Sequence, residues 1–288
     1  MKSGSMLTSI FKPSLYPILA SVMLLASASS CQSNKADGSK AHKHVVTGSK
    51  DTLVYHDSTI KEISPYFAAD GDKIDTTYIG LTYPIFKDST MNRYVKENIL
   101  LGKEQTLDQY VNNFLEGYAN FVEENEVRHP LAWQKETFIG VMMNNPYLIM
   151  MDNNTYEFSG GAHGNSYTLW NVYDVQTKEK LKLNTFISEN KMKEFTKIAE
   201  RFFRKEEGLS DTSSYKEDYF FENDTFSLAA NYGVSKEGII FFYNSYEIKP
   251  YSGGTTFLTI PYEEIQDCMT QTGKNYIKNI KEYYNSIQ

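Results

Sequence analysis

Residues 133–175 read WQKETFIGVMMNNPYLIMMDNNTYEFSGGAHGNSYTLWNVYDV. The apolar and aromatic runs Trp133–Met143, Tyr147–Phe158 and Tyr167–Val175 predict three successive strands. Turn residues separate the first two runs at Asn144-Asn145-Pro146, and Asp152-Asn153-Asn154 predicts a further turn. Short connections of this kind join antiparallel neighbours, so the segment predicts an antiparallel sheet.

Apolar residues on either side of this segment recur at helical spacing. Leu107, Tyr110, Val111, Phe114, Tyr118 and Phe121 form one stripe, and Met192, Phe195, Ile198 and Phe202 form another within residues 190–205. A shorter helix is expected near Asn92–Leu101, and Tyr276, Ile277, Ile280 and Tyr284 predict a terminal helix. Each stripe must pack against a core.

Further strands are predicted before and after the quoted segment. They are Ile79–Ile85, where Pro84 suggests an edge or an end, a hairpin of Phe226–Val234 with Ile239–Ile248, and Thr255–Ile260. Strands in hairpin succession, interrupted by helices, predict an α+β fold: an antiparallel β-sheet with two long amphipathic helices packed on it. We expect an N-terminal α+β part over residues 51–145, a C-terminal part over 146–270 and a terminal helix over 271–288.

The N-terminus has the order of a bacterial lipoprotein signal peptide. Lys2 and Lys12 precede the apolar run Leu15–Leu25, and small residues lead to Cys31. A membrane-spanning helix needs about 20 apolar residues, more than this run provides. The alternative is an ordinary secretory signal, with Cys31 near the cleavage site by chance. Because the chain has only two cysteines, such a coincidence explains Cys31 less well than lipid attachment does. Ala28 departs from the lipoprotein consensus, which prefers Leu.

Residues 1–30 are therefore interpreted as a signal peptide, and Cys31 as the lipidated residue of a protein in the cell envelope, facing the periplasm or the exterior. Residues 31–50 are polar and predict a flexible tether, in which His42 and His44 are tether residues rather than a metal site. Cys268 is then left without a partner, and we expect it to be a buried apolar residue.

Charge excludes one class of partner. Removal of residues 1–30 takes away Lys2 and Lys12 and no acid, so the net charge of −7 becomes −9. That acidity argues against nucleic acid and allows a cationic protein partner. We expect no cofactor and no metal.

The most distinctive motif is Ser159-Gly-Gly-Ala-His-Gly164. Gly160, Gly161 and Gly164 permit positive φ angles or a close approach to the main chain, and a backbone requirement alone would explain all three. His163 is suited to act as a base, a ligand or a hydrogen-bond donor. No Ser, Cys or carboxylate stands at a recognisable catalytic spacing from it.

Four segments together resemble a known family. They are the glycine-histidine motif, Asn171-Val-Tyr-Asp174 before Leu181-Lys-Leu183, Tyr246-Glu-Ile-Lys-Pro-Tyr251-Ser-Gly-Gly254, and Ile260-Pro-Tyr-Glu-Glu264. They look like the extracytoplasmic domain of the RsiV anti-sigma factors, which is similar to the accessory region of PdaC-type peptidoglycan deacetylases. The likeness covers roughly Leu53–Cys268 and is better from about Tyr147.

The resemblance implies binding rather than chemistry, because RsiV proteins use this domain to recognise lysozyme, a cationic enzyme. It makes Tyr246, Pro250, Tyr251, Gly253 and Gly254 candidate binding residues, beside the glycine-histidine motif; a strand end with its turn would explain them equally well. The chain lacks the sigma-binding segment and the membrane helix of RsiV, and the catalytic motifs of a deacetylase. We therefore expect the domain alone, on a lipid tether.

The leading prediction is a non-catalytic envelope lipoprotein that binds lysozyme or a cell-wall component such as a peptidoglycan fragment. One alternative is an envelope hydrolase or deacetylase of cell-wall glycans that uses His163 with Glu157 or Asp174. A structural envelope component is the other alternative.

Overall fold

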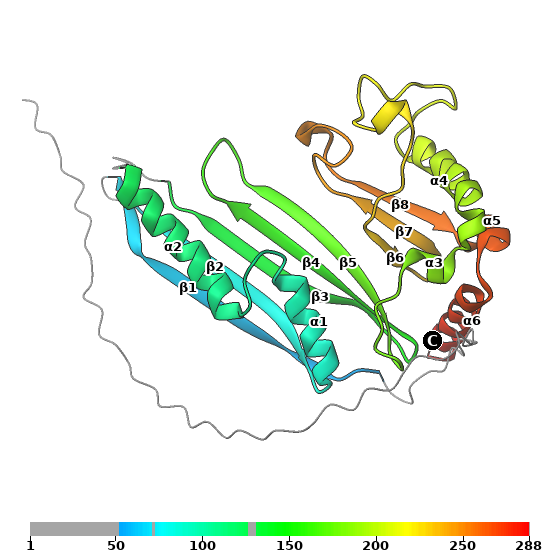
Figure 1. The fold of residues 1–288 in the computed structure, drawn as a ribbon, viewed down its shortest axis with the longest axis horizontal. Coiled ribbons are helices and arrows are strands. Elements are labelled where there is room, and N and C mark those ends of the chain that lie inside the picture. The colour runs from blue at the N-terminus through cyan, green and yellow to red at the C-terminus, as the bar shows by residue number, and fades with distance from the viewer. Residues whose placement is uncertain (1–51, 71–72, 126–130, 288) are drawn as a thin grey trace, which may run out of the picture.

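The computed structural model describes residues 52–70, 73–125 and 131–287. Figure 1 shows their arrangement. The predicted signal peptide over residues 1–30, Cys31, and the tether with His42 and His44 lie outside the described residues. Within the described part of the chain, no helix combines the length and the apolar character that crossing a membrane requires.

The quoted segment forms the centre and one edge of a five-stranded sheet with the order β1-β2-β3-β4-β5. The strands are β1 (Tyr55–Asp70), β2 (Lys73–Phe86), β3 (Gln134–Asn144), β4 (Leu148–Phe158) and β5 (Asn165–Asp174). The α+β class is confirmed. The predicted turn at Asp152-Asn153-Asn154 is wrong, because these residues lie inside β4, where they pair with β3 and β5.

One pairing is not antiparallel. β2 and β3 are parallel, with Tyr78 opposite Gln134 and Thr82 opposite Phe138. A parallel pair requires a crossover, which α1 (Ser89–Ile99) and α2 (Leu107–Asn125) provide. Pro84 lies beyond Thr82, where the pairing with β3 has ended.

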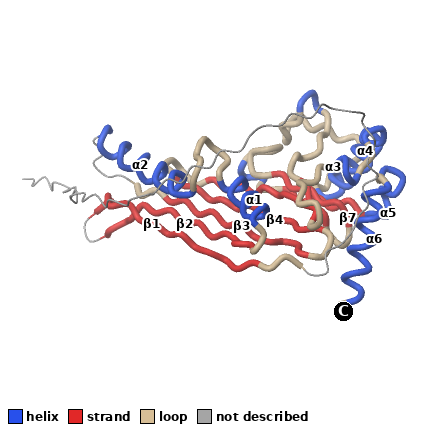
Figure 2. Tube along the Cα trace, turned by 60° about the horizontal axis from the view of Figure 1, so that its bottom comes forward, coloured by secondary structure: helices blue, strands red, loops and turns tan. Residues whose placement is uncertain are grey.

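Both crossover helices lie on the same face of the sheet (Figures 1 and 2). Apolar side chains of α1 and α2 pack there against Ile79, Leu81 and Ile139 of the strands. Asp88 caps α1 by accepting hydrogen bonds from the amides of Thr90 and Met91. Among the described residues, no helix lies on the opposite face over β1 to β3 (Figure 2).

The rest of the described chain builds a second unit around a three-stranded antiparallel sheet with the order β6-β7-β8. Its elements are α3 (Leu183–Phe186), α4 (Met192–Glu206), β6 (Tyr232–Val234), β7 (Gly238–Tyr243), β8 (Thr256–Pro261), α5 (Tyr262–Ile265) and α6 (Gln271–Ser286). The predicted hairpin is present but shorter than expected, because residues 226–231 and 244–248 form loops. Cys268 is buried, as predicted, and burial raises the pKa of its thiol.

β4 joins the two units because both of its faces are buried near its start. Ile149 and Met151 belong to the core beneath α1 and α2, whereas Leu148 and Met150 belong to the core of the second unit. A Cβ atom on Gly233 of β6 would lie 2.2 Å from Cε of Met150, so the second sheet approaches β4 closely. The predicted division between residues 145 and 146 therefore lies inside the first sheet, between two strands that pair with each other.

The outer side of β5 is occupied by loops of the second unit. Asn231 Oδ1 accepts a hydrogen bond from the amide of Trp170 at 2.6 Å, and Asn244 Oδ1 accepts one from the amide of Thr168 at 2.6 Å. Both side-chain amides donate to the carbonyl of Thr168. Leu181 donates its backbone amide to the carbonyl of Val172 at 2.8 Å.

Two strand glycines provide a test of this packing. A Cβ atom on Gly238 would lie 2.1 Å from the carbonyl oxygen of Ile260, whereas on Gly80 the nearest atom would be Cγ of Glu136 at 3.8 Å. We expect Gly238→Ala to lower the free energy of unfolding by about 1–3 kcal/mol, because backbone must move. Gly80→Ala should leave it unchanged or raise it by about 0.5–1 kcal/mol. Urea unfolding measures both; equal effects would contradict the tight β7–β8 contact.

Candidate functional site

The β4–β5 loop holds the glycine-histidine motif, and each glycine has a structural reason to be there. Gly160 and Gly161 have φ angles of 103° and 92°, which other residues rarely adopt. A Cβ atom on Gly164 would lie 2.4 Å from the ring of Tyr156, so this ring covers the bare main chain. The glycines thus turn the chain tightly and leave His163 exposed at the tip.

The second set of candidates lies in the connection between β7 and β8. Tyr251–Gly253 form one turn of 3-10 helix, closed by a hydrogen bond of 2.8 Å from the Gly253 amide to the carbonyl of Pro250. Gly254 follows with a φ of 68°. Tyr246 has a φ of 67°, an uncommon conformation for a bulky residue that is often associated with functional sites.

Side chains of these two loops meet, although about 80 residues separate them in the sequence. Figure 1 shows the two loops on the same side of the molecule. The rings of His163 and Tyr251 stack with centroids 4.1 Å apart and planes 16° apart. The hydroxyl of Tyr246 lies 3.4 Å from Nε2 of His163, and its ring lies 5.4 Å from that of Tyr251. We call His163, Tyr246 and Tyr251 the aromatic loop cluster. All three side chains are exposed, Tyr246 by 51% and Tyr251 by 43%.

Hydrogen bonding fixes the orientation of the imidazole. Nδ1 of His163 lies 2.8 Å from the carbonyl oxygen of Gly164. A carbonyl only accepts, so Nδ1 carries a proton and donates it to this bond. In the neutral ring, Nε2 is then the acceptor that faces Tyr246. Nδ1 is therefore held by the main chain of the β4–β5 loop, and Nε2 faces a member of the cluster.

A buried ion pair between Lys249 and Glu207 holds the β7–β8 connection against the end of α4. Nζ of Lys249 lies 2.8 Å from both carboxylate oxygens of Glu207, which directly follows α4. Thr256 and Tyr219 also donate hydrogen bonds to this carboxylate. Burial by itself would raise the pKa of Glu207, but the bonds from Lys249, Thr256 and Tyr219 outweigh it and hold the pKa below its ordinary value.

Lys249 also sets the position of the glycine turn. A Cβ atom on Gly253 would lie 2.9 Å from Cδ of Lys249, so the turn rests on the lysine side chain. Asn244, at the start of the same connection, is held to Thr168 of β5. The loop that carries Tyr246 and Tyr251 is thus fixed at both of its ends.

Sequence reasoning grouped the exposed residues and missed those that hold them. Lys249, Glu207 and Asn244 were not candidates. One signal was present: Lys249 stands between Ile248 and Pro250, and a lysine in an apolar setting indicates a buried partner. Glu207 gave no comparable signal, since it belongs to a run of charged residues at the end of α4.

The carboxylates considered as catalytic partners of His163 have other roles. Glu157 forms an ion pair of 2.9 Å with Lys135. Asp174 is buried at the far end of β5, where it accepts hydrogen bonds from Tyr276 and the amide of Thr177. β5 starts two residues after His163, and its length places Asp174 about 30 Å away. His163 and Asp174 therefore do not form an acid–base pair. Among the described residues, no group of three or more His, Cys, Asp or Glu is arranged to hold a metal ion.

Two family models match this chain. Residues 182–263 match a model described as a protein of unknown function, DUF3298, and residues 71–166 match one described as deacetylase PdaC. The first covers the connection that carries Tyr246 and Tyr251, and the second ends just after the glycine-histidine motif. The aromatic loop cluster therefore forms where the two matched regions meet. No curated protein matches the sequence.

Solved structures of the DUF3298 family share the fold. One is a family member from Bacteroides fragilis, with 20% sequence identity and a TM-score of 0.66 over 81% of this chain and 100% of that one. Another is a family protein from Pseudomonas aeruginosa, with 18% identity and a TM-score of 0.62 over 77% and 96% of the two chains. The overall fold of this chain, with both units, is thus shared with these two solved proteins.

The ion pair beneath the cluster gives a pH-dependent prediction. Lys249→Met leaves the Glu207 carboxylate buried without its cation, and we expect a loss of about 3 kcal/mol in unfolding free energy at pH 7. Because the pKa of Glu207 is depressed in the intact protein, its stabilising contribution exists above about pH 4.5 and disappears as the pH falls. The difference between the two proteins should therefore shrink in acid.

Urea unfolding between pH 3 and pH 7 measures this difference. Lys278→Met is the matched control, because its partner Glu282 lies 3.9 Å away and both side chains are mostly exposed. The control should lose no more than about 0.5 kcal/mol at any pH. A Lys249→Met penalty that is equally small, or independent of pH, would contradict the supporting role of the pair.

Proposed function

We propose that this chain is a non-catalytic binding protein of the cell envelope and that the aromatic loop cluster is its recognition surface. The observation that carries the proposal is the convergence of two glycine-rich loops, which stack three exposed aromatic rings beside one another. Single exposed aromatic residues are common on protein surfaces. A cluster that is built by distant segments and held from below is the arrangement expected of a binding hot spot.

The composition of the loops supports recognition of a protein. Residues 159–168, which are the β4–β5 loop and the first four residues of β5, read SGGAHGNSYT, and residues 244–256, up to the start of β8, read NSYEIKPYSGGTT. Tyr, Ser, Gly and Asn dominate both, as they do in antibody binding loops. In those loops, tyrosine gives a large contact area at a low cost in conformational entropy, while the small polar residues adapt their hydrogen bonds.

The contacts around the cluster support tight binding, because they fix it before a partner arrives. Tyr251 is stacked on His163, the turn behind it rests on Lys249, and Asn244 is bonded to β5. Few side chains of the cluster would then lose conformational freedom when a partner binds. Each rotamer-rich side chain that need not be immobilised saves about 0.5–1.5 kcal/mol.

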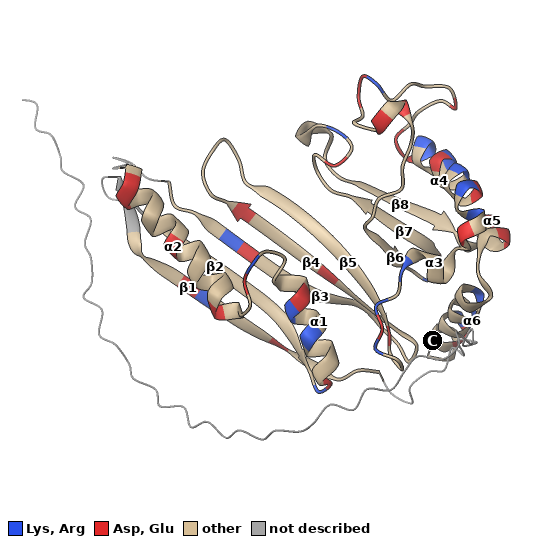
Figure 3. Cartoon of the chain, viewed as in Figure 1, with Lys and Arg blue, Asp and Glu red and all other residues tan. Residues whose placement is uncertain are grey.

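The negative net charge of the whole chain supports a cationic partner. The net charge is −7, whereas residues 158–173 and 250–261 contain no Lys, Arg, Asp or Glu, and residues 244–249 carry one charge of each sign, Glu247 and Lys249. Figure 3 shows the charged residues concentrated elsewhere, notably along α4. An acidic protein with a neutral aromatic contact would attract a cation over distance and bind it by stacking and burial. Lysozyme, implied by the resemblance to RsiV, has this character.

The other parts of the proposal come from the sequence. Lipid on Cys31 would anchor the domain to a membrane of the envelope, facing the periplasm or the exterior. The assignment as a non-enzyme is supported by the distance of about 30 Å between His163 and Asp174 and by the ion pair that Glu157 forms with Lys135. Peptidoglycan fragments remain a second proposed ligand of the protein, and we do not assign their binding to the aromatic loop cluster.

Truncation of one stacked ring tests the proposal. In calorimetric titrations of the full chain with lysozyme, at low and physiological salt, we expect saturable binding. Tyr251→Ala removes the ring that covers His163 and should raise Kd roughly 30-fold, or about 2 kcal/mol, as expected for a hot spot. Phe138→Ala is the matched control: its ring is 48% exposed on β3, outside the two loops, and its loss should leave Kd within about twofold.

Absence of lysozyme binding at both salt concentrations would remove lysozyme as the partner. Equal losses in Tyr251→Ala and Phe138→Ala would remove the cluster as the recognition surface. Hydrolysis or deacetylation of wall fragments by the full chain, abolished by His163→Ala, would overturn the non-catalytic assignment.

A further inference from the structure

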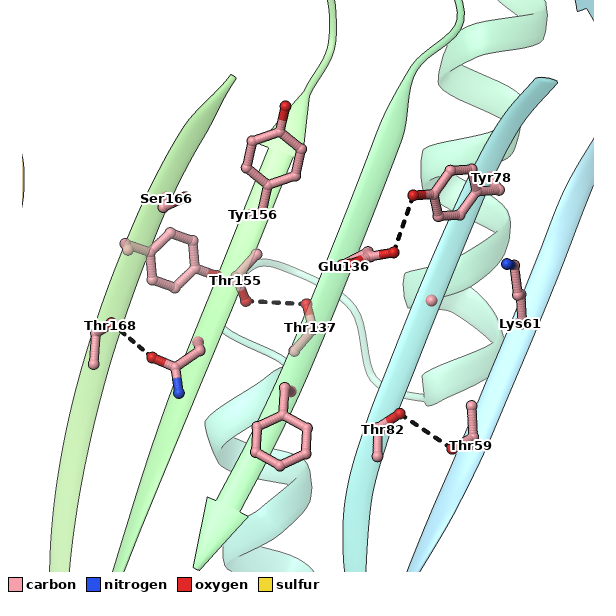
Figure 4. A pocket seen from close by; sticks show the side chains of 14 residues that line it. Thr59, Lys61, Tyr78, Thr82, Glu136, Thr137, Thr155, Tyr156, Ser166 and Thr168 are labelled. Atoms are coloured by element: carbon pink, nitrogen blue, oxygen red, sulfur yellow. Dashed lines mark hydrogen bonds between the residues drawn. The ribbon is translucent and has the colours of Figure 1, made fainter. Parts of the chain in front are cut away.

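The face of the first sheet that lies opposite α1 and α2 is only partly covered. The second unit packs on it near the start of β4, through Leu148 and Met150. Beyond that contact, a hollow of about 560 Å³ extends across the sheet, with lining residues from all five strands (Figure 4). We call it the sheet hollow. Its volume falls in the range of small-molecule sites, and its course across the strands suits a chain-like ligand.

Two exposed rings rise from the sheet hollow. The Phe138 side chain on β3 is 48% exposed and that of Tyr156 on β4 is 39% exposed. Phe138 pairs with Asn154, so Tyr156 is its diagonal neighbour, roughly 7–8 Å away along the sheet. The faces of aromatic rings carry partial negative charge and attract weakly positive C–H groups. The faces of sugar rings present such weakly positive C–H groups and can therefore stack on aromatic rings.

Hydroxyl groups, an amide and a carboxylate line the space beside the rings (Figure 4). Thr59 and Thr82 share a hydrogen bond of 3.1 Å, and the Thr168 hydroxyl donates to Asn154 at 2.7 Å. Tyr78 donates to Glu136 at 2.9 Å. Each hydroxyl retains capacity as donor or acceptor, which matches sugar hydroxyls, since those groups also do both.

The charges of the sheet hollow indicate a neutral ligand. Its lining contains one lysine, Lys61, and one carboxylate, Glu136, in the same cross-strand row. Opposite charges so close together cancel at a distance, so the hollow selects neither polyanions nor polycations. A nucleic acid or a cationic peptide would find no complementary field there.

Gly80 leaves the floor of the sheet hollow open. It stands between Lys61 and Glu136 in that row, and a Cβ atom on it would meet nothing closer than 3.8 Å. No neighbour therefore requires a glycine at this position, and a glycine inside a strand costs about 0.5–1 kcal/mol. Close approach of a ligand to the sheet gives the glycine a purpose.

We propose that the sheet hollow binds a neutral oligosaccharide, whose rings stack on Phe138 and Tyr156 and whose hydroxyls bond to Thr82, Asn154 and Glu136. This site is separate from the aromatic loop cluster and does not depend on it. Tyr156 lies between the two, because its ring also covers Gly164 of the β4–β5 loop.

The test is calorimetric titration of the full chain, in a detergent without a sugar headgroup, with the β-1,4-linked hexasaccharides of glucose and of N-acetylglucosamine. We expect at least one of them to bind with saturation. Phe138→Ala should weaken that binding at least tenfold. Gly80→Thr should abolish it by filling the floor of the hollow, while its melting temperature stays equal or rises, because threonine is favoured in strands.

Tyr251→Ala is the control and should leave the affinity for the sugar within twofold. The proposal is overturned if neither hexasaccharide binds up to millimolar concentration. It is also overturned if Gly80→Thr binds the sugar as well as the unaltered chain does. A third contrary outcome is loss of sugar binding in Tyr251→Ala but not in Phe138→Ala or Gly80→Thr, because the sugar would then occupy the aromatic loop cluster. Lysozyme binding that survives Gly80→Thr would leave the proposed function intact in each case.

Discussion

The arrangement of this protein depends on the burial of both faces of β4. Side chains alternate across a strand, so Leu148 and Met150 point away from Ile149 and Met151. Four consecutive apolar residues can all be buried only if something packs on each side of the sheet. α1 and α2 cover one side, and the β6–β8 unit covers the other. The position of the second unit, and hence of its loops, follows from this requirement.

The second unit covers its face of the first sheet incompletely, and both proposed sites lie at the margins of the covered area. The second unit reaches the start of β4 but leaves the remainder of the face open, which creates the sheet hollow. Asn231 and Asn244 fix its lateral position on β5, which brings Tyr251 onto His163. Small changes in this docking would alter the cluster more than the hollow, because only the cluster takes residues from both units.

Local patterns predicted the elements well and their pairing less well. The stripes that begin at Leu107 and Met192 became α2 and α4 with bounds close to those expected. The parallel pairing of β2 with β3 was missed, because hydrophobic periodicity does not encode strand direction. Asp152, Asn153 and Asn154 suggested a turn, yet Asn153 is buried in β4 and donates a hydrogen bond to the carbonyl of Asn98. Tertiary contacts there outweigh the local preference of these residues for turns.

For the candidate site, glycine chemistry and family likeness selected residues that the structure does bring together: His163, Tyr246 and Tyr251. Their stacking could not be derived from spacing, since it depends on docking between units. The supporting pair was missed for a related reason. Burial gives Lys249 and Glu207 their importance, and a sequence does not state which charges are buried.

The side-chain amides along β5 also matter for solubility. An unpaired strand edge is a template on which another chain can extend the sheet. Asn231, Asn244 and the backbone of Leu181 occupy the polar groups of Thr168, Trp170 and Val172. The second unit therefore blocks pairing of β5 with a strand of another molecule. As long as the second unit is not folded onto it, that edge of β5 remains open to pairing with another chain.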